Sequence, residues 1–155
     1  GEAVEELLGE AVGACRAALR IYTKTDHPLD WAAAQTNLAN ALRAQGVNLT
    51  EEEYLDVGMS LFGEAIEACR AALTVCTETD HPLDWAEIQR SLGDALRTQG
   101  ERASGEGGEA LLCAAIAAYR AALRVYTEEH FPHQWKIVTN NLDATLGALE
   151  NRKGR

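Results

Sequence analysis

The 155-residue chain has few aromatic residues, only three prolines and no long apolar run. Aromatic side chains make up 6% of the residues, whereas 46% are hydrophobic, and alanine and leucine supply much of that fraction. This composition suits closely packed helices better than sheets. No segment approaches the roughly 20 consecutive apolar residues that a membrane-spanning helix needs, so we expect no membrane partner.

Basic residues are also scarce, with 14 Lys and Arg against 24 Asp and Glu and a formal net charge of −10. A polyanion such as DNA or RNA is repelled by such a chain on average. The sequence contains no cluster of four or more basic residues, and we interpret the basic stretch at 152–155 as a frayed tail. We therefore expect no nucleic-acid partner.

Motifs that carry chemistry are absent from the sequence. It has no glycine-rich phosphate loop after a strand, no HExxH or CxxC pattern and no nucleophile motif. The acidic stretch 105–108 is rich in glycine but does not follow a predicted strand. We therefore expect no enzyme activity, no cofactor and no metal site.

The four cysteines do not form the pattern of a disulfide framework. Cys15 and Cys69 occupy the same place in two copies of an internal repeat, and Tyr119 stands there in the third. Cys76 likewise alternates with tyrosine. We predict free, core-facing thiols and a reducing, cytoplasmic location. Cys69 and Cys76 share a helical face, which leaves a metal or redox role open.

An eight-residue stretch, Thr-Asp-His-Pro-Leu-Asp-Trp-Ala, occurs at 25–32 and recurs identically at 79–86. A diverged copy lies at 129–136, and the prolines set a period of 54 and then 50 residues (82 − 28 and 132 − 82). The segments 14–46 and 68–100 agree at about two-thirds of their positions. A repeat of this size predicts stacked units, each of which buries its apolar face against its neighbours.

The His and Asp residues of this stretch allow a catalytic or a structural interpretation. His27 and His81 lie beside aspartates, as in acid–base or metal sites, but a regular array holds them one unit apart. The third copy also loses the pair. We interpret the stretch as a helix start, in which Asp26 and Asp80 cap backbone N–H groups and proline occupies the first turn. The tryptophans are predicted to pack at the junctions between units: Trp31, Trp85 and Trp135.

Each period contains two helical patterns, which predicts six helices. Their expected ranges are 2–24, 28–45, 53–78, 82–99, 108–128 and 132–149. Gly46 and Gly100 are predicted to end the second and fourth helices. Thr50–Glu53 fits a capping box that opens the third, and Gly105–Gly108 is predicted to be a flexible turn.

These features together resemble tetratricopeptide repeats, in particular the long repeats of kinesin light chain. The resemblance rests on Thr36-Asn37-Leu38-Ala39 followed by Gly46, on Ala65, Cys69 and Ala72 at the family's small–large–small positions, and on Asp80-His81-Pro82. It covers nearly the whole chain, although the repeat is longer than the common length of about 34 residues. The resemblance implies an all-α, right-handed α-solenoid of antiparallel helix pairs spanning 1–155. Its parts are an unpaired helix at 2–24, repeats at 28–79 and 82–129, and a terminal helix at 132–149.

In tetratricopeptide arrays the first helix of each unit lines a concave groove, so the resemblance also implies a binding site. The groove residues in this register are Thr36, Asn37, Asn40, Arg43, Arg90, Asp94, Arg97, Asn140 and Asn141. The family's peptide-binding asparagines carry over to Asn37, Asn40 and Asn141, but Ser91 and Asp94 depart from the pattern. Asparagine bonds both the N–H and the C=O of a peptide backbone, and arginine pairs with carboxylates. The expected function is a protein–protein interaction scaffold that binds an extended peptide, acidic or C-terminal, in the groove.

Two alternatives remain open at the level of the sequence. The array can be a structural spacer or a self-association segment of a larger multidomain protein, with exposed end helices that dock to another copy. A small-molecule pocket in the groove is the other. Resemblance of fold predicts a binding scaffold without naming its target.

Overall fold

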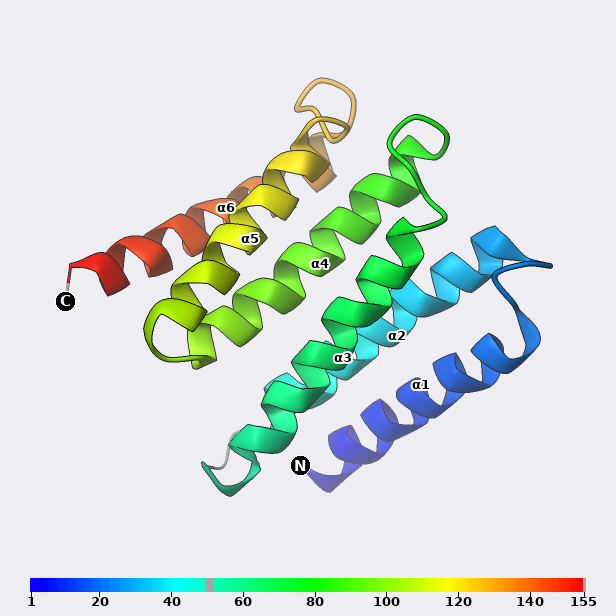
Figure 1. Ribbon diagram of the computed structural model, residues 1–155, viewed down its shortest axis with the longest axis horizontal. Helices are drawn as coiled ribbons and strands as arrows, with labels where there is room; N and C mark the ends of the chain where they lie inside the picture. The colour runs from blue at the N-terminus through cyan, green and yellow to red at the C-terminus, as the bar shows by residue number, and fades with distance from the viewer. Residues whose placement is uncertain (50–51, 155) are drawn as a thin grey trace. The chain divides into compact units, whose positions relative to one another are not determined.

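The computed structural model describes residues 1–49 and 52–154, and over these residues the chain is all-helical, with no strand. The elements are α1 (Glu2–Ile21), α2 (Pro28–Asn48), the 3-10 turn η1 (Glu52–Tyr54), α3 (Leu55–Leu73), α4 (Pro82–Arg102), α5 (Gly105–Leu123) and α6 (Pro132–Lys153) (Figure 1). The predicted all-α class with six α-helices is therefore confirmed. No helix in the described part is long and apolar enough to cross a membrane. The chain divides into two compact units, Gly1–Thr77 and Glu78–Arg155.

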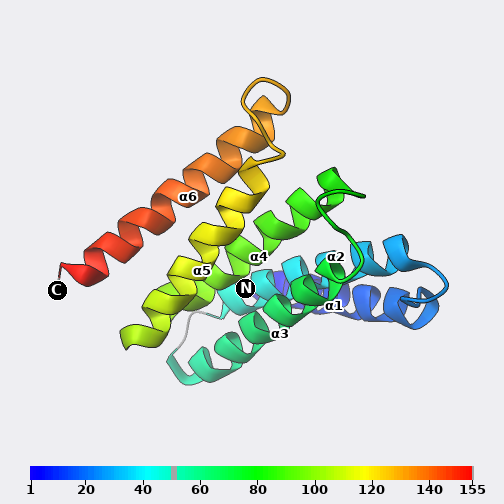
Figure 2. The same cartoon turned by 45° about the horizontal axis from the view of Figure 1, so that its top comes forward.

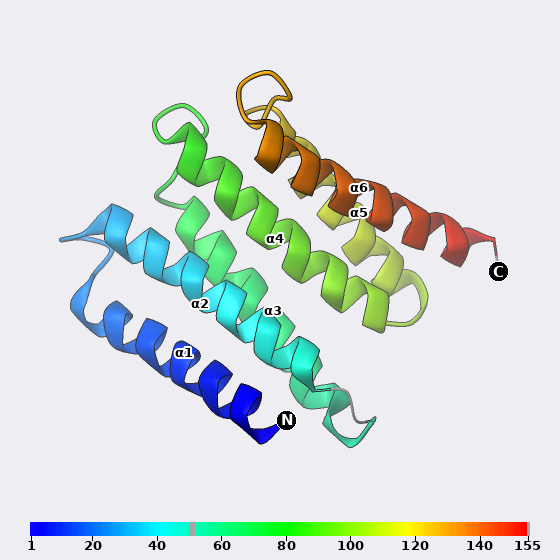
Figure 3. The same cartoon turned by 180° about the vertical axis from the view of Figure 1, so that it is seen from behind.

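In the first unit, α1 and α3 both pack against α2 (Figure 3). The core between α2 and α3 is made of small side chains around a few large ones, and Leu42, Phe62 and Cys69 are almost fully buried. An ion pair of 3.1 Å between Arg16 of α1 and Glu64 of α3 joins the two outer helices at the surface. The alanine-rich composition thus serves close helix contacts rather than a large aromatic core.

In the second unit, α5 packs against both α4 and α6, and α4 also touches α6 (Figure 2). Leu112 and Tyr119 of α5 and Val138 of α6 have no exposed surface. Thr145 of α6 is also buried, and its hydroxyl donates to the Asn141 carbonyl at 2.7 Å. The Thr145 hydroxyl is thus satisfied within its own helix, whereas the buried hydroxyl oxygens of Ser91 and Thr139 have no hydrogen-bond partner among the described residues.

The repeated stretch does start α2 and α4, but the cap residue of each helix is a histidine. The cap residues are His27 and His81, whose side chains make no capping bond, and a proline follows each. Asp26 lies one residue earlier, so the prediction that it caps α2 is wrong, and Asp80 lies one residue before the cap of α4. Instead, the Asp26 N–H donates to the Thr23 hydroxyl at 3.1 Å, which turns the chain just before the helix.

Gly46 and Gly100 do not end their helices, because α2 continues to Asn48 and α4 to Arg102. Both glycines are buried, and a Cβ at Gly46 would lie 2.6 Å from Cε1 of Phe62. A Cβ at Gly100 would lie 3.1 Å from Leu112, which occupies the equivalent place in the second repeat. These glycines therefore permit a close helix crossing, which the sequence pattern does not distinguish from a helix end.

α6 also runs past its predicted limit of 149, to Lys153. Three other helix ends differ in the opposite direction. α1, α3 and α5 end at Ile21, Leu73 and Leu123, three to five residues before the predicted limits. After α3 the N–H groups of Thr74 and Cys76 turn back to the carbonyls of Ala71 and Ala72, each at 3.1 Å. This tight turn satisfies the last carbonyls and stops the helix.

The predicted glycine turn and capping box also need revision. Gly105 has a φ of 67°, which favours glycine, and α5 begins at this residue, so 106–108 form its first turn rather than a flexible loop. Thr50, on which the predicted capping box depends, lies outside the described residues. α3 begins at Leu55, directly after η1.

The basic C-terminal stretch is not frayed over its described part. Arg152 belongs to α6, and its guanidinium donates to the Gly100 carbonyl at 2.7 Å and to the Ala103 carbonyl. It also reaches the Glu101 and Gly105 carbonyls, both at 3.4 Å. Carbonyls at the end of a helix lack helical partners, so Arg152 closes the end of α4 and fastens α6 to it.

Replacing Arg152 with alanine is expected to lower the free energy of unfolding by about 2 kcal/mol, because partly buried carbonyls lose a charged donor. Urea unfolding followed by far-UV circular dichroism measures the change. Lys153→Ala is the matched control, since Lys153 is an exposed basic neighbour on the same helix. Equal stability of the two variants would show that the Arg152 contacts contribute nothing.

Candidate binding surfaces on α2 and α4

The structure brings three predicted groove residues together on α4: Arg90, Asp94 and Arg97. Asp94 is only 4% exposed, and its Oδ2 accepts a hydrogen bond from Nη1 of Arg90 at 3.2 Å. Its Oδ1 accepts from the Tyr119 hydroxyl at 2.6 Å and from Nδ2 of Asn141 at 3.0 Å. One buried carboxylate thus links α4 to α5 and α6.

The two arginines of this row are held by further partners in the same unit. Nε of Arg90 donates to Glu87 at 3.1 Å, and the Tyr126 hydroxyl donates to the same carboxylate at 3.2 Å. Arg97 donates from Nε to the Tyr119 hydroxyl at 3.3 Å and from Nη1 to Glu101 at 3.4 Å. We call this connected set the α4 network: Glu87, Arg90, Asp94, Arg97, Glu101, Tyr119, Tyr126 and Asn141.

Electrostatics keep the tyrosines of the α4 network protonated. Burial raises the pKa of Tyr119 well above its usual range, and the nearby carboxylate of Asp94 raises it further. The pKa of Tyr126 is raised in the same way by burial and by Glu87. Both phenols therefore remain hydrogen-bond donors. The chemistry of the α4 network is internal hydrogen bonding, and most of its donors and acceptors are already paired.

The equivalent row on α2 contains Thr36, Asn40 and Arg43. Thr36 is buried, and its hydroxyl donates to the Ala32 carbonyl at 2.9 Å. Asn40 and Arg43 are half-buried, and Nε of Arg43 is buried with no hydrogen-bond partner in the described part of the chain. Asn37 is exposed beside them. We call Asn37, Asn40 and Arg43 the α2 surface.

No network like that of α4 forms on the described residues of α2, because most positions of the network carry other residues in the first repeat. Asn40 stands where Asp94 stands, and the buried Cys69 and Cys76 replace Tyr119 and Tyr126. Ala33, Thr36 and Val47 likewise stand in the places of Glu87, Arg90 and Glu101. The glycine that faces Tyr119 is also replaced. A Cβ at Gly93 would lie 2.6 Å from Cε1 of Tyr119, and the equivalent residue in the first repeat is Ala39, which faces a smaller partner.

Asn37 also lines a cavity of about 310 Å³ between α1 and α2. Its other lining residues are Ala14, Cys15, Ala18, Tyr22, Asp30, Ala33 and Ala34. Ala34 occupies the place of Ile88 and Val138 in the other copies, so smaller side chains leave this space open. Asn140, the remaining predicted groove residue, is exposed on α6 and belongs to neither surface.

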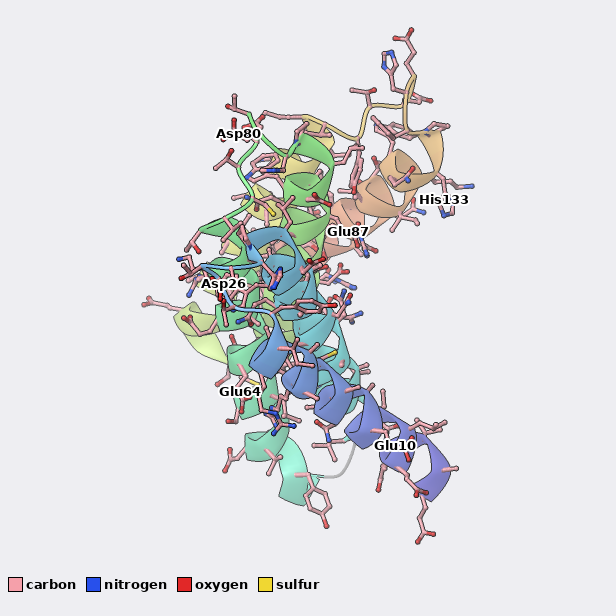
Figure 4. The ribbon with its side chains drawn as sticks, turned by 90° about the vertical axis from the view of Figure 1, so that its right-hand side faces the viewer. Glu10, Asp26, Glu64, Asp80, Glu87 and His133 are labelled. Atoms are coloured by element: carbon pink, nitrogen blue, oxygen red, sulfur yellow. The ribbon has the colours of Figure 1, made fainter. Side chains whose placement is uncertain are left out.

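The three tryptophans of the repeated stretch are buried or half-buried within their own units. Trp85 is buried, and the Arg124 guanidinium lies 5.2 Å from its ring centroid while it pairs with Glu78. Trp31 and Trp135 are half-buried. Figure 4 labels Asp26 and Asp80 in the loops that precede α2 and α4. No cluster of three or more His, Cys, Asp or Glu side chains that could hold a metal is found among the described residues.

The cysteines are free, as predicted, but they do not all face the core. Cys69 and Cys76 are buried, whereas Cys113 is exposed. Cys15 is half-buried, and its burial raises the pKa of the thiol. A raised pKa lowers the fraction of reactive thiolate at neutral pH.

The sequence pattern did not identify Tyr119, Glu87, Tyr126 or Arg152 as important polar residues. A signal for Tyr119 was present in the sequence. Tyr119 stands where the first repeat has Cys69, and on the facing helix Gly93 stands where the first repeat has Ala39. A comparison of the chain with protein-family models, with curated proteins and with solved structures gave no match. Function is therefore argued from the two helix surfaces themselves.

Proposed function

We propose that the chain is a tetratricopeptide-like scaffold that binds an extended segment of a partner protein along α2. The observation that carries the proposal is the α2 surface, on which Asn37, Asn40 and Arg43 have no hydrogen bond or ion pair with the described residues. In this proposal, the helix pairs of 28–79 and 82–129 stack as in a right-handed α-solenoid.

The side chains of the α2 surface match the chemistry of a peptide. An asparagine amide can donate to a backbone carbonyl and accept from a backbone N–H, which suits an extended chain. Arg43 offers a planar fork to a carboxylate. Its buried Nε lacks a partner among the described residues, and an unsatisfied buried donor is costly, so a bound carboxylate would relieve that cost.

The negative net charge of the chain favours a peptide ligand with a single carboxylate over one with a long acidic tract. With a net charge of −10, a run of acidic residues would be repelled on average. A single carboxylate, such as the C-terminus of a partner, needs only Arg43. The α4 network has little capacity for a ligand of this kind because Arg90 and Arg97 already bond carboxylates of their own helix.

The proposal is tested with random peptides displayed on phage and selected on the purified chain. Enriched peptides are then synthesised with a fluorophore, and their binding is measured by fluorescence anisotropy. Arg43→Glu is expected to weaken binding roughly tenfold or more, because repulsion replaces an ion pair. Blocking the C-terminal carboxylate of the peptide with an amide should have a similar effect.

Arg120→Glu is the matched control, since Arg120 is an exposed arginine on α5 with no role in either surface. It makes the same change of net charge and should leave the affinity unchanged. Asn40→Ala is a milder variant that removes no charge and should weaken binding less than Arg43→Glu does. Selected peptides that bind Arg43→Glu as well as the unmodified chain would overturn the assignment of the site.

A further inference from the structure

α5 lies between two helices of its unit, whereas its counterpart α1 packs against one. By repeat position, α1 corresponds to α5 and α2 corresponds to α6. α5 packs against both α4 and α6, but within the first unit α1 packs only against α2, apart from its surface ion pair with α3 (Figure 3). The place beside α1 and α2 that corresponds to α4 is therefore not filled by any described helix of the first unit.

The face of α5 that receives α4 is buried, and the same face of α1 is partly open. On α5 the residues of this face are at most 5% exposed, and they are Leu112, Ala115, Tyr119, Ala122 and Tyr126. Their counterparts on α1 are half-buried or exposed, and Tyr22 is 37% exposed. We call these counterparts the α1 row: Leu8, Ala11, Cys15, Ala18 and Tyr22.

The cavity of about 310 Å³ between α1 and α2 lies at the unfilled place. Three of its lining residues occupy positions whose counterparts in the second unit donate hydrogen bonds to carboxylates of α4. The pairs of equivalent residues are Cys15 with Tyr119, Tyr22 with Tyr126, and Asn37 with Asn141. Tyr22 and Asn37 keep the same side-chain type, so the donors that meet α4 in the second unit are also present in the first.

A helix can fill this place only if it has a glycine opposite the large residue of the α1 row. In the two occupied copies, Gly46 of α2 lies against Phe62 of α3, and Gly100 of α4 lies against Leu112 of α5. Leu8 stands at the position of these two large side chains. Because the distance between two helix axes depends on the side chains at the contact, a glycine opposite Leu8 permits the same close approach.

The covering helix also needs a small residue seven positions before this glycine. α2 has Ala39 there and α4 has Gly93 (46 − 39 and 100 − 93). The residue opposite Gly93 is the large Tyr119, whereas α1 has Cys15 at that position, as α3 has a cysteine. Alanine is therefore small enough for the helix that covers α1, as it is in α2.

Polar groups at the cavity select further among such helices. Asp94 of α4 accepts a hydrogen bond from Asn141, so an asparagine or aspartate directly after the small residue can accept from Asn37. Asp30 also lines the cavity, and a carboxylate at the position of Glu87 would meet this negative charge. The corresponding residue of α2 is an alanine, which avoids the repulsion. The face of α2 therefore fits this place better than the face of α4.

We propose that the α1 row and Asn37 form a seat for one α-helix of a partner protein. The helix has a face like that of α2, with an alanine, then an asparagine or aspartate, and a glycine seven residues after the alanine. Its apolar face enters a groove between two helices, which is a common mode of peptide recognition. The proposal goes beyond the extended peptide on α2 and does not rest on it.

A second copy of the chain does not supply a helix of this kind. Among the described helices of the same repeat type, α2 and α4 already cover α3 and α5, which leaves α6. α6 has Asp143 and Glu150 at the two positions that must be small. Seated on α1, these carboxylates would lie against Cys15 and Leu8, and an unpaired buried charge is costly.

A synthetic peptide with the sequence of residues 28–48 serves as the helix, because it contains Ala39, Asn40 and Gly46 at the required spacing. The peptide carries a fluorophore, and its binding to the intact chain is measured by fluorescence anisotropy. The matched control is the same peptide with Ala39→Asp and Gly46→Glu, which copies the carboxylates of α6. The control is expected to bind roughly tenfold or more weakly, because large charged side chains prevent the close helix contact.

Alkylation of the native cysteines, followed by mass spectrometry, tests where the peptide binds. A saturating concentration of the 28–48 peptide is expected to slow the alkylation of Cys15 several-fold, because the seated helix covers this thiol. Cys113 is exposed on α5, so its rate serves as the internal control and should not change.

A charged residue placed in the seat should prevent binding. Ala14→Glu is expected to weaken binding of the 28–48 peptide roughly tenfold or more, because Ala14 lines the cavity and would place a carboxylate under the helix. Ala14 is exposed, so the change removes little packing within the chain. Ala114→Glu is the matched control, since Ala114 is an exposed alanine of α5 and should leave the affinity unchanged.

The proposal is overturned if the 28–48 peptide does not bind, if the control peptide binds equally well, or if Cys15 reacts at the same rate with and without saturating peptide. It is also overturned if Cys15 becomes protected as the concentration of the chain alone is raised, since that result assigns the seat to a second copy. Arg43→Glu tests the extended peptide site and Ala14→Glu tests the seat, so the failure of one proposal is distinguishable from the failure of the other.

Discussion

Replacing Asp94 with alanine is expected to lower the free energy of unfolding by about 3 kcal/mol, a large effect for a single side chain. The substitution removes an acceptor that serves Arg90, Tyr119 and Asn141. Tyr119 has no exposed surface, so its hydroxyl cannot turn to water. Asp94→Asn, which copies Asn40 of the first repeat, keeps one acceptor and should cost less.

The Asp94 prediction is measured by urea unfolding and localised by hydrogen exchange. Exchange should accelerate in α4, α5 and α6 and remain unchanged in α1, α2 and α3, because these partners of Asp94 lie in the second unit. Asp143→Ala is the matched control, since Asp143 is an exposed aspartate of α6. If Asp143→Ala lowered the free energy of unfolding as much as Asp94→Ala does, the hydrogen bonds of Asp94 in the α4 network would not account for the loss of stability.

The second large effect concerns Gly93 and depends on Tyr119. Gly93→Ala alone is expected to lower the free energy of unfolding by about 2 kcal/mol, because the new methyl group would lie 2.6 Å from the Tyr119 ring. In a Tyr119→Cys background the sign should reverse. The ring is then absent, and alanine stabilises a helix interior by up to about 1 kcal/mol relative to glycine.

A double-mutant cycle over Gly93→Ala and Tyr119→Cys measures this coupling. Gly147→Ala in α6 is the control, because no described atom lies within 4 Å of a Cβ built at Gly147. It should stabilise the chain slightly in either background. The packing argument fails if Gly93→Ala costs the same with and without the tyrosine ring.

The period of the sequence was sufficient to predict six helices and most of their starts. Proline at 28, 82 and 132 begins α2, α4 and α6 because its fixed φ suits a first helical turn and its missing N–H is not needed there. The helical spacing of alanine, leucine and cysteine also identified faces that are buried, such as the one containing Ala65, Cys69 and Ala72. Helix starts and apolar helix faces depend on residues that are close together in the sequence, so they can be predicted from one sequence.

The candidate site was less predictable, since its residues were placed in a row but not assigned partners. Arg90, Asp94 and Arg97 do share a face of α4, as the spacing predicted. Whether such a row is open to a ligand depends on side chains that are distant in sequence. Asn141 lies 47 residues from Asp94 and is hydrogen-bonded to it, whereas Asn37 and Asn40 have no such partner in the described chain.

The sequence by itself determined the helical class, the repeat and the helix starts, because these follow from local backbone preferences and from periodicity. Only the tertiary structure decided what each glycine and each charged residue does. Gly46 and Gly100 could end a helix or permit the close approach of a neighbouring helix. The structure shows the close approach, because Phe62 and Leu112 pack against these glycines. Arg152 could lie in a frayed tail or bind the carbonyls at the end of α4. The structure shows the second, because its guanidinium donates to the Gly100 and Ala103 carbonyls. In each case the stabilising interaction is a contact between two helices, and the residues near it in the sequence do not specify that contact.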